Sequence, residues 1–148
     1  NSLTELGYKI LNVITWQKTN PPPNLGCRCF THSTETVLWA KKNDKKSRHF
    51  FNYEKMKAEN GGKQMKDVWT GALTKPSEKT EGKHPTQKPE YLLERIVLAS
   101  TENGQVILDP FCGSGTTGVE ALRLGRKFIG IEFLQISKKR LEKAANEK

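Results

Sequence analysis

A short apolar run that ends in a carboxylate and a glycine-rich turn constrains this chain more than any other feature. Residues 106–108 (Val-Ile-Leu) are typical of a buried parallel strand, and Asp109 follows them directly. Gly113 and Gly115 let the backbone turn without a Cβ, and an amphipathic helical pattern then runs to Gly125. We predict a strand, a loop and a helix in succession, which is how α/β folds build a cofactor-binding corner.

Two further features indicate what this corner binds. The free backbone N–H groups near Thr116 and Thr117, at the start of the predicted helix, can face an anionic group. A second apolar run, residues 128–131, ends in Glu132. An acidic residue at the end of the second strand, about 20 residues past the glycines, is where α/β folds hydrogen-bond a ribose hydroxyl. We therefore predict a ligand with a ribose.

The glycines at 113, 115 and 118 also satisfy G-x-G-x-x-G, which suggests a nicotinamide or flavin dinucleotide. A dinucleotide fingerprint places its first glycine directly at the strand end, whereas residues 109–112 intervene here. The wider loop offers Asp109 for an ammonium group and Phe111 as an apolar wall. These suit the amino-acid tail of S-adenosylmethionine better than a diphosphate, so a dinucleotide oxidoreductase is the disfavoured alternative.

A second motif lies upstream. Residues 84–89 read His-Pro-Thr-Gln-Lys-Pro, and the closing proline suits the first position of a helix whose apolar residues between 92 and 97 share one face. Together with residues 109–117, this block resembles the C-terminal part of a DNA amino-methyltransferase of the adenine-N6 or cytosine-N4 kind. It resembles more specifically the permuted group, in which the cofactor region follows the catalytic region. Residues 16–23 and 35–39 resemble the strand regions that precede target recognition in that group.

The resemblance implies an α/β Rossmann-like fold with S-adenosylmethionine as methyl donor. It also implies direct methyl transfer to the exocyclic amine of a flipped base in double-stranded DNA. We expect adenine N6 within a restriction-modification or epigenetic system. Cytosine N4, an RNA or protein substrate, and a non-catalytic DNA-binding remnant are the alternatives. The expected cofactor-binding residues are Thr86, Lys88, Asp109, Phe111, Gly113, Gly115, Thr116, Thr117, Glu132 and Phe133.

No catalytic residue is expected within this chain. Residues 20–23 (Asn-Pro-Pro-Pro) lack the aromatic that stacks on the flipped base in the resembling family, so we interpret them as a polyproline-type loop. In that family the catalytic strand lies beside the 106–108 strand, between it and the strands expected at Ile10–Trp16 and Glu35–Ala40. We therefore predict an incomplete sheet with a central gap, to be completed by an N-terminal part of the enzyme or a complementing chain. Whether the protein forms a homodimer is left open.

The middle of the chain is strongly basic. Residues 41–83 hold 12 Lys and Arg against 6 Asp and Glu, a large share of the net charge of +9. Interleaved cations and aromatics suit phosphate contacts, and in the resembling family this position carries target recognition. We expect Lys45, Lys46 and Arg48 to bind DNA. The alternative is a solvated insertion with a satellite core around Trp69.

Composition bounds the remaining classes. A chain of 148 residues fits one ordinary domain, divided here into a strand region (1–40), a basic target-recognition-like insertion (41–83) and a cofactor-binding part (84–148). It has no long apolar segment, so we expect a cytoplasmic protein without a membrane partner. The three cysteines suit a reducing compartment. Cys27, Cys29 and His32 lack a fourth ligand at metal spacing, so we expect no metal.

Overall fold

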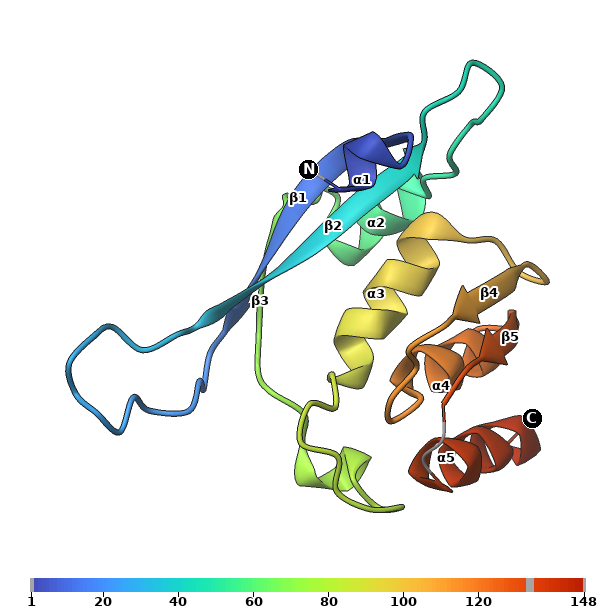
Figure 1. Cartoon of the computed structure of the whole chain (residues 1–148). Coiled ribbons are helices and arrows are strands. Elements are labelled where there is room, and N and C mark those ends of the chain that lie inside the picture. The colour runs from blue at the N-terminus through green and yellow to red at the C-terminus, as the bar shows by residue number, and fades with distance from the viewer. Residues whose placement is uncertain (1, 133–134, 148) are drawn as a thin grey trace.

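The computed structural model describes residues 2–132 and 135–147. Its elements form two groups, each built around a small sheet (Figure 1). None of the described helices is long and apolar enough to cross a membrane. In chain order the elements are α1 (Ser2–Glu5), β1 (Tyr8–Lys18), β2 (Thr34–Lys42), α2 (Tyr53–Glu59), β3 (Val68–Gly71), the 3-10 helix η1 (Pro76–Glu78), α3 (Glu90–Ser100), β4 (Val106–Asp109), α4 (Thr116–Arg123), β5 (Lys127–Gly130) and α5 (Gln135–Asn146).

The first sheet has the order β2-β1-β3. β1 pairs with β2 as a long antiparallel hairpin, with a register shift between Ile10 and Asn12, and with β3 in parallel. Branched and aromatic residues in β1 favour an extended strand. Its alternation places Ile14 and Trp16 in the interior.

The core of this group lies between the sheet and α3. Ile14, Trp16, Trp69 and Leu92 form the buried cluster. The Trp16 indole N–H donates a 2.8 Å hydrogen bond to the hydroxyl of Tyr91 on α3. Because Trp16 is only 1% exposed, this bond satisfies a donor that water cannot reach.

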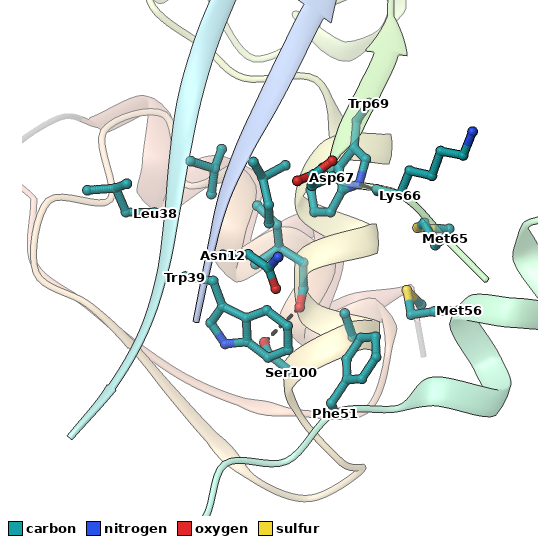
Figure 2. A pocket seen from close by; sticks show the side chains of 14 residues that line it. Asn12, Leu38, Trp39, Phe51, Met56, Met65, Lys66, Asp67, Trp69 and Ser100 are labelled. Carbon is teal, nitrogen blue, oxygen red and sulfur yellow. Dashed lines mark hydrogen bonds between the residues drawn. The ribbon is translucent and has the colours of Figure 1, made fainter. Parts of the chain in front are cut away.

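A cavity of about 140 Å³ remains in this core, near the C-terminal end of α3. Figure 2 shows Trp39, Phe51, Met56 and Trp69 around it, with Ser100 at its α3 side. The lining is mostly apolar, and the cavity lies at the opposite end of α3 from residues 84–89. The cavity is therefore part of the core and not of a ligand site at the 84–89 loop.

The region 41–83 is more closely integrated than an insertion with its own satellite core. Trp69 belongs to the main core cluster, because β3 pairs with β1 in the first sheet. α2 packs on α3, where the Asn52 N–H donates to the Ala99 carbonyl and Met56 is buried. This region thus completes the first sheet on one side and covers part of α3.

The second group is a β4-β5 parallel pair with α4 and α5. The strand predicted at residues 106–108 extends to Asp109, and the strand predicted at 128–131 is Lys127–Gly130. Pro89 differs slightly from expectation, since its extended ψ of 145° makes it the cap before α3 and not its first residue. α4 packs against both α3 and α5.

No strand among the described residues joins the two sheets, so the expected gap beside β4 is present. α3 lies between the two sheets (Figure 1). Apolar side chains on the strands near the gap are solvent-exposed, although such residues normally face a covering layer. They are Val13, Leu38, Val106, Leu108, Ile129 and Ile131.

Candidate functional site

The carboxyl ends of β4 and β5 carry the predicted ligand-binding carboxylates. The ladder continues past both strands, because the Ile131 N–H donates a 3.0 Å hydrogen bond to the Asp109 carbonyl. The Asp109 carboxylate accepts a 3.1 Å bond from the Phe111 N–H, which shapes the turn that follows. One carboxylate oxygen of Asp109 therefore holds the loop, in addition to any ligand role.

Cys112 lies between the two predicted carboxylates. Burial raises the pKa of its thiol, and the negative charges of Asp109 and Glu132 raise it further. The thiol is thus kept protonated, which agrees with the expectation of a small buried residue. Next to it, a cavity of about 330 Å³ is lined by Cys112, Gly130 and Glu132 from the strand ends, and by residues of α5.

The glycine turn is held from below by α5. Gly113 and Gly115 have φ values of +51° and +78°, a region in which a side chain would be strained. The Arg140 guanidinium, only 6% exposed, donates to the Ser114 carbonyl at 2.8 Å and to the Thr116 hydroxyl at 2.9 Å. The Thr116 side chain therefore faces the interior, and only its backbone remains suited to a ligand.

The 84–89 loop meets the glycine turn, as the paired motifs require. A Cβ added at Gly113 would lie 3.7 Å from the His84 ring. The Thr86 N–H and hydroxyl both lie 3.3 Å from His84 Nδ1. The structure thus brings Thr86 to the same edge as Asp109, with His84 orienting the loop.

Lys88 is placed differently from Thr86. Its ammonium lies 2.6 Å from the Glu35 carboxylate, which also binds Lys18 at 2.9 Å. Partial burial opposes ionisation of Glu35, yet the hydrogen bonds from Lys88 and Lys18 hold its pKa below the usual value. Both ammonium groups also lie within 6 Å of the Trp16 ring centroid, at 5.7 Å and 5.9 Å. Lys88 therefore ties its loop to the first sheet.

The two aromatic candidates have different outcomes. Phe111 is 90% exposed, so it does not pack in the core of the described part of the chain. Its ring remains available as an apolar wall at the mouth of the loop. Phe133 lies outside the described residues.

The predicted DNA-binding residues lie at the far end of the first sheet. Lys45, Lys46 and Arg48 follow β2, at the end of the hairpin where β1 begins. Figure 1 shows this connection on the opposite side from the β1–β2 loop. At about 3.3 Å per strand residue, β2 separates the two ends by roughly 30 Å. The structure does not bring these cations to the glycine turn.

Sequence reasoning missed a charged network behind the site. Glu90, at the start of α3, binds Arg123 at 2.7 Å and Arg140 at 3.3 Å. Arg123 also lies 3.0 Å from Glu120, which is 4% exposed. Burial raises the pKa of Glu120 to about 7, although Arg123 opposes the shift. The i,i+3 spacing of Glu120 and Arg123 was visible in the sequence, whereas Arg140 sits among charged neighbours that suggested a solvated face.

The described residues, 2–132 and 135–147, bring together no three His, Cys, Asp or Glu side chains that could hold a metal ion. The donor set instead fits S-adenosylmethionine. Two carboxylates at adjacent strand ends suit an ammonium group and a ribose, and a side-chain-free turn separates them from a helix N-terminus.

Comparisons with known proteins agree with this geometry. A model of the DNA methylase family matches residues 2–146. The chain is 73% identical to the type II methyltransferase M2.LlaDCHI of Lactococcus lactis subsp. cremoris and 71% identical to M2.DpnII of Streptococcus pneumoniae. The alignments cover 97% and 99% of this chain but 55% and 56% of those proteins, so the chain spans about half the length of these relatives.

Solved structures give the same result. The M1.HpyAVI–SAM complex matches with a TM-score of 0.75 at 35% identity, over 97% of this chain and 66% of that one. The cytosine-N4-specific PvuII DNA methyltransferase matches with a TM-score of 0.70 at 21% identity, over 98% and 59%, which shows a shared fold. The resemblance drawn from residues 84–89 and 109–117 is thereby confirmed, as is S-adenosylmethionine as the cofactor. The chain belongs to the DNA methylase family of S-adenosylmethionine-dependent amino-methyltransferases.

Proposed function

We propose that this chain is the cofactor-binding part of a type II DNA methyltransferase that methylates adenine N6 in a specific DNA sequence. The observation that carries the proposal is the meeting of the 84–89 loop with the glycine turn, beside Asp109 and Glu132. High identity to type II methyltransferases supports the reaction class.

Each residue of the site has a proposed role toward the cofactor. Glu132 accepts hydrogen bonds from the ribose hydroxyls, and the Asp109 carboxylate binds the ammonium of the methionine tail. Thr86 donates to the carboxylate of that tail, and Phe111 closes the pocket as an apolar wall. The backbone of Gly113, Gly115, Thr116 and Thr117 allows close approach, while Lys88 positions the Thr86 loop through Glu35.

When bound, S-adenosylmethionine supplies an electrophilic methyl group on a sulfonium. The residues of this chain orient that group and exclude water, which is most of what a direct transfer requires. The base amine would be held by a catalytic motif outside this chain. Residues 20–23 are not assigned to that task, because Pro23 cannot stack on a base or donate a hydrogen bond.

Cytosine N4 is the second candidate target. It is supported by the shared fold of the PvuII enzyme, whose identity to this chain is 21%, against 71–73% for the type II relatives above. The test is transfer of a labelled methyl group to DNA by a full-length enzyme that carries this chain, followed by separation of the nucleosides. Label in N6-methyladenine supports the proposal, label in N4-methylcytosine selects the second candidate, and no transfer indicates a non-catalytic DNA-binding protein.

A further inference from the structure

The β1–β2 connection, residues 19–33, extends away from the body of the protein (Figure 1). It carries two large apolar side chains with almost complete exposure, Phe30 at 101% and Leu25 at 91%. Exposed apolar side chains on a projecting segment indicate a contact surface when they occur together.

Hydrogen bonds within this loop give it a defined shape. The Asn24 side-chain amide donates to the Cys29 carbonyl at 2.9 Å, and its oxygen accepts from the Gly26 N–H at 3.0 Å. The Cys27 N–H donates to the Asn24 carbonyl, and Cys27 adopts a left-handed φ of 49°. A non-glycine residue in this region is costly and is typical of functional segments. Asn24 therefore holds the tip between Leu25 and Phe30.

The base of the loop is attached to the first sheet. The Lys18 N–H donates to the Ser33 carbonyl at 2.7 Å, and the Thr19 N–H donates to the Gly71 carbonyl at 3.0 Å. The Asn20 side chain accepts from the Leu73 N–H at 2.8 Å. The loop is thus fixed where it leaves the sheet.

A chain of contacts places this base at the same edge as the cofactor loop. Lys18, at the end of β1, binds Glu35, and Glu35 binds Lys88. Lys88 lies in the same short loop as His84, whose ring faces Gly113. The apolar tip is therefore on the side where a substrate must approach the methyl group.

The charge of the loop suits a polyanion. Residues 19–33 contain Arg28 and His32 but no Asp or Glu, in a chain of net charge +9. Phosphate backbones attract such a surface, while apolar and aromatic side chains contact bases that have left the stack.

We infer that residues 19–33 form a DNA-contacting loop, in which Phe30 and Leu25 contact bases exposed when the target nucleotide leaves the helix and Arg28 contacts a phosphate. This rests on the proposed DNA methyltransferase function. It adds a base-contacting surface at the methyl-transfer edge, separate from Lys45, Lys46 and Arg48.

Three cysteines allow a direct footprint of this surface. Cys27 and Cys29 are exposed on the loop, whereas Cys112 is buried. In a full-length enzyme that carries this chain, iodoacetamide labelling is followed by mass spectrometry with and without the DNA that the enzyme methylates. We expect DNA to slow labelling of Cys27 and Cys29 several-fold while Cys112 remains poorly labelled in both.

A matched pair of variants then measures the contribution of the apolar contacts. Phe30→Ala should raise the Kd for DNA between about five-fold and a hundred-fold, the range of one base-stacking contact. Leu6→Ala removes a 73% exposed apolar side chain at the other end of β1 and should leave the Kd unchanged. Phe30→Trp should restore binding, because an aromatic face is kept.

Unchanged labelling of Cys27 and Cys29 in a DNA complex that is methylated normally would overturn the inference while leaving the proposed function intact. Absence of methyl transfer and of DNA binding by the parent enzyme would overturn both. Protection that depends on protein concentration without DNA, with a doubled mass in solution, would show that a second copy covers the loop and would also overturn it.

Discussion

Glu120 should make the stability of this protein fall as the pH rises through neutrality. Its carboxyl is 4% exposed, and burial raises its pKa from 4.5 to about 7. A carboxyl with a raised pKa binds its proton more tightly in the folded state. Its contribution to stability is therefore fully present below pH 4.5 and is lost as the pH rises toward and through 7.

The magnitude follows from the size of the shift. From 4.5 to about 7, at about 1.36 kcal/mol per pKa unit, the loss amounts to roughly 3 kcal/mol. Such a loss is a large part of the total stability of a typical domain, which is about 5–15 kcal/mol. Movement of Arg123 toward the ionised carboxylate would reduce it.

The perturbation is Glu120→Gln, which keeps the side-chain shape and removes the titration. Urea unfolding of a full-length protein that carries this chain would be followed at several pH values between 4.5 and 8 for parent and variant. We expect the parent to lose up to about 3 kcal/mol relative to the variant across this range. Glu142→Gln on the exposed face of α5 is the control and should follow the parent. A difference between parent and Glu120→Gln that does not change with pH would refute the reasoning.

The other predictions concern binding and completeness. Glu132→Ala should weaken S-adenosylmethionine binding by roughly ten-fold to a hundred-fold, as loss of a charged hydrogen bond does, and an unchanged titration isotherm would remove the ribose assignment. Neutralising Lys45, Lys46 and Arg48 should reduce the salt dependence of DNA binding by about 0.9 in log–log slope for each phosphate that is no longer neutralised, and a parent-like slope would show that they are only solvated. Residues 1–148 alone should give no detectable methyl transfer to DNA, with transfer appearing on co-expression of an upstream segment. Robust transfer by this piece alone would make residues 20–23 a catalytic candidate again.

The local parts of the fold could be predicted, because their signals are contained in a few neighbouring residues. The strand that ends at Asp109 and the turn at Gly113 and Gly115 formed where the apolar run and the glycines indicated. β3 could not be predicted in the same way. It is four residues long, and its parallel partner β1 lies about fifty residues upstream, so only tertiary packing defines it.

Side-chain partners were the least predictable feature. Lys88 was expected at the cofactor, but its nearest partner in the structure is Glu35, more than fifty residues away in sequence. Arg140 was interpreted as part of a solvated face, because its neighbours in α5 are charged. Its burial depends on the position of the glycine turn beneath which α5 packs. Pairings of this kind depend on how elements are assembled and leave no periodic signal in the chain.

The two hydrogen bonds from Arg140 to the glycine turn join the C-terminal helix to the ligand-binding loop as a single cooperative unit. Thermodynamic linkage then requires that whatever stabilises the turn also stabilises the helix, by the same free energy in both directions. Occupancy of the turn by ligand should therefore slow amide hydrogen exchange in α5, although α5 lies behind that turn. Substitutions that unfold α5 would accordingly lower the affinity for the cofactor without touching it.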